Sequence, residues 1–253
     1  MTAAARTVAL GARFNGPPGS ANGGYACGTA AVALTDGPAE VVLRRPPPLD
    51  VPLDVVETAE GVELQHEGQT VAAARRWEGT VEVPAPPSRS ELASAVARFD
   101  TAAYASQHPF ARCFTCGPSR PDGDGLGLFP APVAPTMVAW PWSPSPSTAG
   151  DDGLVVAPVV WASLDCPSGL CWMHAPDGST SGPVVLGRLA VRIDRRPAVD
   201  EALIVGGWQI AAEGRKRLGG TAVWADDGEV LASAQATWVV LDEAQAQAFR
   251  AGS

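Results

Sequence analysis

The chain has 253 residues, of which 46% are hydrophobic and 18% charged, and its net charge is −9. This composition is typical of a folded globular protein rather than a disordered one. The acidic balance disfavours nucleic-acid binding, which needs a basic face. No apolar run approaches the roughly 18 to 20 residues that span a bilayer, and the first residues lack a signal-peptide pattern. We therefore expect a cytoplasmic protein with no membrane span.

The first part of the chain predicts a strand, one buried helix and then a set of short strands. Residues 7–14 form a strand candidate, and residues 24–34 are small and apolar, which favours a buried helix. Short β-branched segments separated by Gly and Pro favour an antiparallel sheet. These strand candidates are 40–45, 53–58, 62–66, 70–77 and 80–83.

A connecting helix is predicted at residues 88–104, with Ser88 or Ser90 as N-cap and apolar residues along one face. The second part repeats the first pattern. It predicts one long buried helix at 155–174, opened by Pro158, which is tolerated in a first turn. Its strand candidates are 125–130, 136–142, 184–193, 202–213, 216–225 and 229–241.

Two segments of the chain are nearly alike. Residues 44–55 read RRPPPLDVPLDV and residues 195–205 read RRPAVDEALIV. The likeness continues from 67–74 to 227–234, and each copy soon reaches a Trp. An internal repeat indicates one fold written twice. We expect two units, 1–104 with the connector helix and 105–253, each large enough to bury a core.

A central helix wrapped by an antiparallel sheet resembles the hotdog fold. Residues 186–205 and 224–241 are similar to the C-terminal strands of phenylacetate-type acyl-CoA thioesterases. Residues 113–128, CFTCGPSRPDGDGLGL, resemble a Cys-Phe-x-Cys-Gly segment found in many members of that superfamily. The resemblance covers the second unit nearly throughout and the first more weakly. It implies an α+β double hotdog in which the two units form a pseudo-dimer.

The resemblance also implies where chemistry occurs. Related thioesterases begin the central helix with His-Gly-Gly or a similar turn, whose N–H polarises the thioester carbonyl, and carry a carboxylate eight residues after the first Gly. The first unit has Asn22-Gly23-Gly24 but Ala31 at the carboxylate position. The second unit has Asp165 but begins with Val156-Ala157-Pro158, and proline has no N–H. We therefore predict one composite site formed by Asn22, Gly23, Gly24 and Asp165, and one vestigial site.

Two other roles for Asp165 stay open, since its side chain can face solvent or cap a local backbone group. Pro167 predicts a bend in the helix beside it. Ser168 is a candidate to orient the carboxylate. Relatives often carry Ser or Thr on the strand after the helix, where this chain has Gly187.

Substrate-binding candidates come from an aromatic residue and the basic clusters. Trp161 is a candidate for the wall of an acyl tunnel. In hotdog thioesterases, arginines near these strands hold CoA phosphates, and guanidinium groups suit phosphate geometry. This implies Arg195, Arg196 and Arg215 as candidates, with a solvated strand end as the alternative. The basic residues are Arg44, Arg45, Arg195, Arg196, Arg215, Lys216 and Arg217.

The five cysteines are odd in number and irregularly spaced, which disfavours a disulfide framework. Cys113-x-x-Cys116 with His108 resembles part of a zinc site. A structural zinc normally needs four ligands, and the spacing of Cys166 and Cys171 in an apolar helix suits packing better. The sequence therefore predicts no metal, and no cofactor other than the CoA carried by the substrate.

The sequence favours a hydrolase acting on an acyl-CoA or another thioester, with Asp165 as base or nucleophile. The main alternative is a non-catalytic acyl or acyl-CoA binding protein, because the usual His and the strand hydroxyl are missing. A structural scaffold is a third class. A hotdog dehydratase is disfavoured because its paired Asp/His motif is not found. Assembly into a homo-oligomer is left open.

Overall fold

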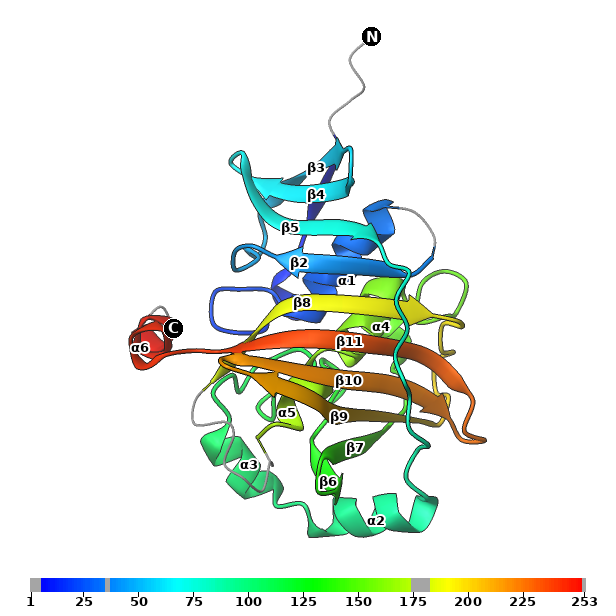
Figure 1. The fold of residues 1–253 in the computed structure, drawn as a ribbon. Helices are drawn as coiled ribbons and strands as arrows, with labels where there is room; N and C mark the ends of the chain where they lie inside the picture. The colour runs from blue at the N-terminus through cyan, green and yellow to red at the C-terminus, as the bar shows by residue number, and fades with distance from the viewer. Residues whose placement is uncertain (1–5, 35–36, 174–182, 252–253) are drawn as a thin grey trace.

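The computed structural model describes residues 6–34, 37–173 and 183–251, and its strands form one antiparallel sheet (Figure 1). The strands are β1 Thr7–Ala9, β2 Ala39–Leu43, β3 Pro52–Thr58, β4 Gly61–His66, β5 Gln69–Arg76, β6 Ala131–Ala134, β7 Met137–Trp142, β8 Val184–Ile193, β9 Leu203–Glu213, β10 Lys216–Ala225 and β11 Val230–Val240. The helices are α1 Gly23–Leu34, α2 Arg89–Arg98, α3 Thr101–Gln107, α4 Ala157–Ser163, α5 Cys166–Leu170 and α6 Glu243–Ala251.

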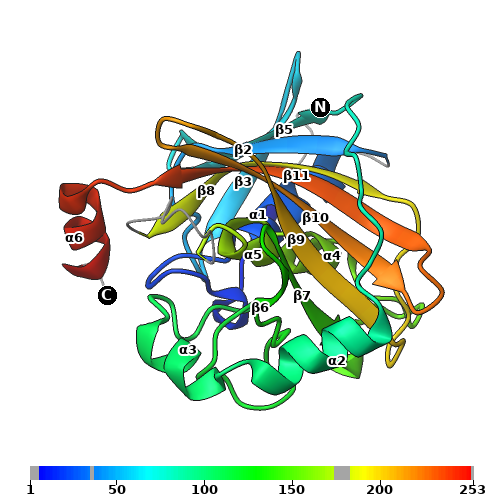
Figure 2. The same cartoon turned by 60° about the horizontal axis from the view of Figure 1, so that its bottom comes forward.

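The sheet consists of two halves that meet at its centre. The strand order is β1-β3-β4-β5-β2-β8-β11-β10-β9-β7-β6, and β2 pairs with β8. Helices α1, α4 and α5 lie together on one face of the curved sheet (Figures 1 and 2). Helix α1 packs on strands of the first half, and α5 packs on β9 and β10 of the second. The hydrophobic core fills the space between the sheet and these helices.

The two halves repeat the same backbone connections. Ahead of α1, the Ala21 N–H donates to the Pro47 carbonyl at 2.8 Å. Ahead of α4, the Val155 N–H donates to the Pro197 carbonyl at 2.8 Å. Each bond ties the start of a central helix to the loop that precedes a long strand. The sequence repeat is therefore a structural repeat.

The structure shifts the predicted alignment of the repeat by one residue at its start. Asp50 and Asp200 both adopt the left-handed conformation, with φ of 57° and 58°. Counting back from these residues pairs Arg45, not Arg44, with Arg195. The hydrogen bonds agree, since the Arg45 N–H donates to Val71 and the Arg195 N–H to Leu231. The extra proline in the first copy explains the offset.

Two predicted helices are each divided. The helix predicted at 155–174 is α4 followed by α5, because Pro167 lacks an N–H and its ring clashes with the preceding turn; residue 174 lies outside the described residues. The helix predicted at 88–104 ends at Arg98, and Asp100 starts α3 by accepting the Ala103 N–H at 2.9 Å. The predicted unit boundary after residue 104 falls inside α3, and α2 packs against β6 and β7.

The predicted strand at 80–83 is wrong. Residues 77–88 instead run as extended chain over the outer face of the second half of the sheet (Figure 1). There Val81 and Val83 pack against Trp208 and Trp224. The β-branched pattern therefore reflects packing onto a sheet and not pairing within one. The strand predicted at 125–130 is also wrong, because the strand in this region is β6, which begins at Ala131. The sequence did not predict helix α6.

A buried carboxylate links the two halves at the seam between β2 and β8. Glu40 on β2 is only 2% exposed, and it binds Arg188 of β8 and Arg75 of β5. Burial on its own raises the pKa of the Glu40 carboxyl, but the hydrogen bonds from Arg188 and Arg75 outweigh it and hold the pKa below its usual value. Glu40 is therefore ionised in the folded protein and stabilises the seam.

Helices α1 and α4 approach each other at two glycines of α1. A Cβ on Gly24 would lie 2.6 Å from the Trp161 carbonyl oxygen, and a Cβ on Gly28 would lie 2.6 Å from Pro158 Cα. Both distances are shorter than real Cβ atoms tolerate, so no side chain fits at either position. Among the described residues, no helix is long and apolar enough to cross a membrane.

We expect Arg188→Met to lower the free energy of unfolding by about 2 kcal/mol at neutral pH, the scale of a hydrogen bond to a charged group. Because the pKa of Glu40 is lowered in the folded state, its stabilisation is complete above the unfolded pKa near 4.5 and is lost as the pH falls through the folded value. The loss caused by Arg188→Met should therefore shrink in acid, as measured by urea unfolding at several pH values. Arg192→Met, which breaks an exposed pair with Asp194, is the control and should cost less than about 0.5 kcal/mol. Equal losses in both variants would contradict this role of Glu40.

We expect Gly28→Ala to lower the free energy of unfolding by about 1–3 kcal/mol, because the new methyl group would overlap the backbone of α4. Gly11→Ala is the matched control, since its nearest atom would be 3.9 Å away and its φ is −65°. Denaturant unfolding of both variants measures the difference. A Gly28 variant as stable as wild type would show that α1 and α4 do not pack this closely.

Candidate functional site

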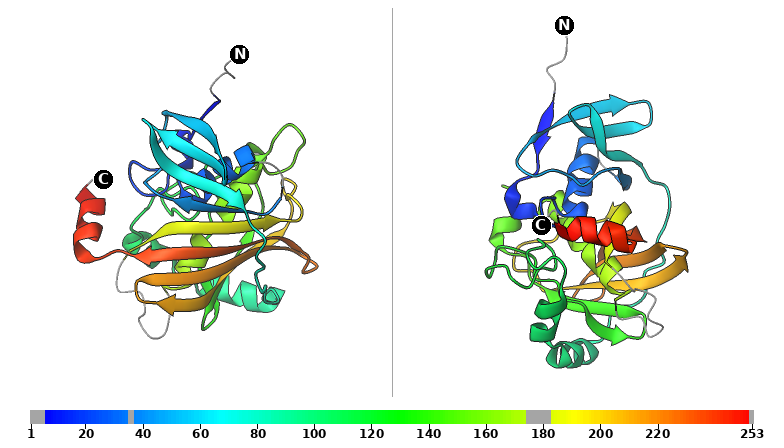
Figure 3. Two further views of the ribbon diagram at one scale, coloured as in Figure 1. Left: turned by 45° about the horizontal axis from the view of Figure 1, so that its top comes forward. Right: turned by 90° about the vertical axis from the view of Figure 1, so that its left-hand side faces the viewer.

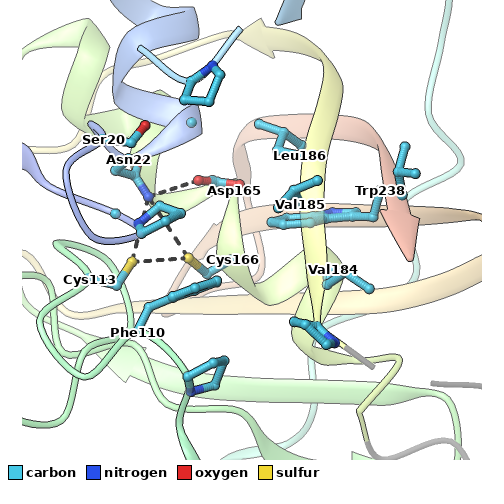
Figure 4. A pocket seen from close by; sticks show the side chains of 18 of the residues that line it. Ser20, Asn22, Phe110, Cys113, Asp165, Cys166, Val184, Val185, Leu186 and Trp238 are labelled. Carbon is cyan, nitrogen blue, oxygen red and sulfur yellow. Dashed lines mark hydrogen bonds between the residues drawn. The ribbon is translucent and has the colours of Figure 1, made fainter. Parts of the chain in front are cut away.

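A cavity of about 790 Å³ opens beside the N-terminus of α1. Its walls come from both halves of the chain, namely the loop before α1, the end of β2, the start of β8, the end of β11 and helix α5. Most of the lining is apolar, and Figure 4 shows Val184, Val185, Leu186 and Trp238 along one side. Asn22 and Asp165 lie at its inner end, together with three cysteines.

Asn22 caps α1 and is 1% exposed. Its Oδ1 accepts the Tyr25 N–H at 2.9 Å, which satisfies one of the free donors at the start of the helix. This bond fixes the orientation of the amide. Its Nδ2 therefore points across to α5 and donates to Asp165 Oδ2 at 2.8 Å (Figure 4).

Asp165 lies between α4 and α5, at the break that Pro167 imposes. Its carboxylate is 2% exposed. Oδ2 accepts from Asn22 and from the Gly24 N–H, the latter at 2.9 Å. Oδ1 has no hydrogen-bond partner among the described residues. The other two predicted roles, a solvent-facing side chain and a cap of a local backbone group, are wrong.

The environment of Asp165 alters its proton affinity. Burial raises the pKa of Asp165 to about 7, and the charge of Cys113 acts in the same direction. The hydrogen bonds from Gly24 and Asn22 oppose this rise. A carboxyl with a pKa near neutrality can both accept and return a proton at physiological pH.

The backbone N–H groups of Gly23 and Gly24, which form the predicted turn, differ in their hydrogen bonding. The Gly24 N–H, expected to polarise a substrate carbonyl, is already bonded to Asp165. The Gly23 N–H is the first of the helix and has no partner among the described residues. Gly23 also lines the cavity, which Gly24 does not. Gly23 is therefore the donor available to a ligand, and Gly24 holds the carboxylate.

The predicted substrate-binding residues do not line the cavity. Trp161 is 3% exposed and packs against Gly28 of α1. Arg195 pairs with Glu201 and Glu229, and Arg196 pairs with Asp152. Arg215 pairs with Asp242. These side chains are used in packing or in surface ion pairs.

The cavity is instead bordered by the arginines of the first copy of the repeat. Arg44 and Arg45 line it, and both are exposed. Arg45 donates to Gln69 at 2.7 Å, whereas the Arg44 guanidinium has no hydrogen-bond or ion-pair partner among the described residues. The sequence repeat could have identified Arg44 and Arg45, because they stand in the first copy of the segment that contains Arg195 and Arg196. The composite site uses the start of α1, and the loop after β2 lies beside that helix start.

Ser168 does not contact the Asp165 side chain. Its hydroxyl donates to the Asp165 carbonyl at 2.6 Å and accepts the Trp238 Nε1–H at 2.9 Å. It thus fixes Trp238 in the cavity wall. Gly187 lines the cavity on β8 and offers no side-chain oxygen to the carboxylate.

Cysteines from the 113–117 loop and from the start of α5 lie beside Asn22. Cys113, Cys116 and Cys166 place their sulfur atoms within 4.8 Å of one another, and all three line the cavity. Cys166 was assigned to packing from its spacing to Cys171. Cys171 packs as predicted, with Val138 and Trp172, and Cys166 packs with Cys113, Cys116 and Leu170.

Three solved structures resemble the chain over nearly its whole length. A TesB protein of Mycobacterium avium subspecies paratuberculosis is 15% identical, with a TM-score of 0.60 over 92% of this chain and 91% of its own. An acyl-CoA thioesterase II, TesB2, of Mycobacterium marinum is 14% identical, with a TM-score of 0.56 over 87% and 88%. A protein of Novosphingobium aromaticivorans is 16% identical, with a TM-score of 0.58 over 96% and 98%.

These similarities show the fold. The chain has the α+β double hotdog architecture that the sequence predicted. No protein-family description matches the chain, and no curated protein matches it in sequence.

Proposed function

We propose that the protein is a thioester hydrolase that acts on acyl-CoA through one composite site between the two hotdog units. The observation that carries this proposal is the Asp165 carboxylate at the inner end of the cavity. One of its oxygens is fixed by Asn22 and Gly24, and within the described part of the chain the other has no partner. Gly23, whose N–H is unbonded among the described residues, lines the same cavity. The resemblance of the sequence and fold to thioesterases supports the same reaction.

The chemistry follows from these two groups. Asp165 Oδ1 binds a water molecule and takes its proton as the water oxygen attacks the thioester carbonyl carbon. The carbonyl oxygen gains negative charge and accepts the Gly23 N–H, at the positive end of α1. When the tetrahedral intermediate collapses, the C–S bond breaks and the proton passes from Asp165 to the thiolate. Water and thioester become a carboxylic acid and a thiol, and Asp165 is restored.

The cavity suits both ends of an acyl-CoA. Its inner wall includes Leu43, Leu186 and Trp238, which provide an apolar surface for an acyl chain. Arg44 and Arg45 border it and offer guanidinium groups to the phosphates of CoA. A local pair of cations attracts an anionic ligand even though the chain as a whole is acidic.

A non-catalytic acyl-CoA binding protein is the second candidate, and one observation favours it. Asp165 Oδ1 has no orienting partner among the described residues, and Gly187 stands on β8 where relatives often carry a hydroxyl. A carboxylate without that support positions water less well. The two candidates differ in turnover and not in ligand.

We expect Asp165→Asn to lower kcat for an acyl-CoA by at least about 100-fold, the contribution of a general base. The amide keeps an oxygen for the Gly24 N–H, so folding and ligand binding should persist. Thiol release from a panel of acyl-CoAs measures kcat, and calorimetry with a non-hydrolysable thioether analogue measures Kd. Asp152→Asn, at an exposed ion pair, is the control and should retain full activity.

Two outcomes would remove the hydrolase proposal. One is an unchanged kcat in Asp165→Asn. The other is tight binding of acyl-CoA by the wild type with no thiol released from any chain length, which supports the binding protein.

We expect the double variant Arg44→Ala/Arg45→Ala to raise KM for an acyl-CoA about tenfold, which corresponds to about 1.4 kcal/mol. KM for the matching N-acetylcysteamine thioester, which lacks the phosphates, should not change. The control is Arg195→Ala/Arg196→Ala, the other copy of the repeat, which should leave both KM values unaltered. A larger effect of the control pair would place the CoA at the other end of the pseudo-dimer.

A further inference from the structure

The three clustered cysteines are arranged as metal ligands are. Cys113 Sγ and Cys166 Sγ lie 3.6 Å apart, and Cys116 Sγ lies within 4.8 Å of both. Ligands on a tetrahedral zinc, with Zn–S bonds of roughly 2.3 Å, stand about 3.8 Å from one another. The sulfur atoms would therefore need to move by about 1 Å at most to share one ion.

The 113–117 loop, which contains Cys113 and Cys116, folds so that its backbone surrounds the Cys113 sulfur. The backbone N–H groups of Thr115 and Cys116 donate to it, and the Gly117 N–H donates to the Cys113 carbonyl at 2.8 Å. No side chain fits at Gly117, because its Cβ would lie 2.4 Å from the Cys113 nitrogen. A Cys-x-x-Cys turn whose N–H groups point at the first sulfur stabilises a thiolate, which is the form that binds metal.

The loop is also fixed in place against both units. The Phe114 N–H donates to Asn15 at 2.7 Å, and Thr115 Oγ1 donates to the Ala162 carbonyl of α4 at 2.9 Å. Cys166 is the first residue of α5. The three sulfur atoms therefore come from two segments that the fold holds together without the ion.

Two side chains donate to the sulfur atoms. Asn22 Nδ2 lies 3.8 Å from Cys113 Sγ and 3.9 Å from Cys166 Sγ (Figure 4). His108 Nδ1 accepts the Phe110 N–H at 3.0 Å, so a neutral ring carries its proton on Nε2. That Nε2 lies 3.3 Å from Cys116 Sγ. His108 is thus a hydrogen-bond donor to a thiolate and not a ligand.

From this cluster we propose that Cys113, Cys116 and Cys166 bind one Zn²⁺ ion as three thiolates. Binding displaces the protons that the three thiols still carry, and these protons pass to the solvent. Thiolate ligands select zinc over hard cations such as Mg²⁺ and Ca²⁺. All three cysteines line the cavity, so the fourth coordination position faces it and is completed by solvent. The ion would tie the 113–117 loop to the start of α5, one residue from Asp165.

The full-length protein, purified under reducing conditions and dialysed after loading with ZnSO₄, should hold one zinc per chain by elemental analysis. Exchange for Co²⁺ should give the intense visible bands of a tetrahedral site and sulfur-to-cobalt charge-transfer bands in the near ultraviolet. Imidazole should shift the visible bands by occupying the fourth position. A tetrahedral spectrum that does not respond to imidazole would overturn the open fourth position.

Variants of the cluster cysteines test the site, and two variants outside the cluster are the matched controls. Cys113→Ser and Cys166→Ser should each lower the zinc content at least tenfold after dialysis. Cys27→Ala and Cys171→Ala remove the two other cysteines, both buried, and should leave it at one per chain. Because a cluster variant can fail to fold, alkylation of the wild type with and without zinc gives an independent measurement. Zinc should protect Cys113, Cys116 and Cys166 from the reagent.

Three results would overturn the proposal. One is a wild type that keeps less than about a tenth of an equivalent of zinc after loading. Another is equal alkylation of the cysteines with and without the metal. The third is a Cys113–Cys166 disulfide found by peptide mass mapping of freshly purified protein, which would make the sulfur pair a redox element. None of these measurements depends on thioester hydrolysis.

Discussion

The contact between the Asp165 carboxylate and the N-terminus of α1 organises the end of the protein that holds the cavity. A buried carboxylate is costly unless it is hydrogen-bonded, and here its partners come from the other half of the chain. Asn22 supplies an amide and Gly24 a backbone N–H. The partial positive charge of a helix start favours an anion at this place. The two units are therefore joined by the group that the proposed chemistry needs.

That contact depends on how closely the central helices pack. Gly24 and Gly28 allow α1 to rest on the backbone of α4 (Figure 3). A larger residue at Gly24 would displace the carboxylate from the N–H that binds it. The break between α4 and α5 is equally necessary, since Pro167 ends the first helix and leaves Asp165 between the two. The same break places Cys166 at the start of α5, facing the cysteines of the 113–117 loop.

The two copies of the repeat share the same backbone framework, but they differ at the starts of their central helices. Both copies retain the backbone bond to Pro47 or Pro197 and the left-handed Asp50 or Asp200. Those features set the path of the chain at the same place in each copy. The helix starts differ in sequence, with Asn22-Gly23-Gly24 in one copy and Val156-Ala157-Pro158 in the other. The seam between β2 and β8, with Glu40 buried in it, keeps the two copies in one sheet.

The sequence by itself determined the features that local patterns encode. The strands β8 and β10 follow their predicted ranges, and α1 follows its run of small residues. Periodicity and turn residues act over a few positions, which is why these predictions hold. The strand at 80–83 was wrong because β-branched residues also suit a segment that packs on a sheet.

Only the tertiary structure decided which distant groups meet. Asn22 and Asp165 are far apart in the chain, and their hydrogen bond depends on the crossing of α1 and α4. The same crossing commits the Gly24 N–H to Asp165, while the Gly23 N–H stays unbonded among the described residues. The path of the loop after β2 places Arg44 and Arg45 beside the cavity, whereas Arg195 and Arg196 do not line it. No spacing in the sequence brings Cys166 to Cys113 and Cys116, because their meeting is set by the packing of a loop on a helix start.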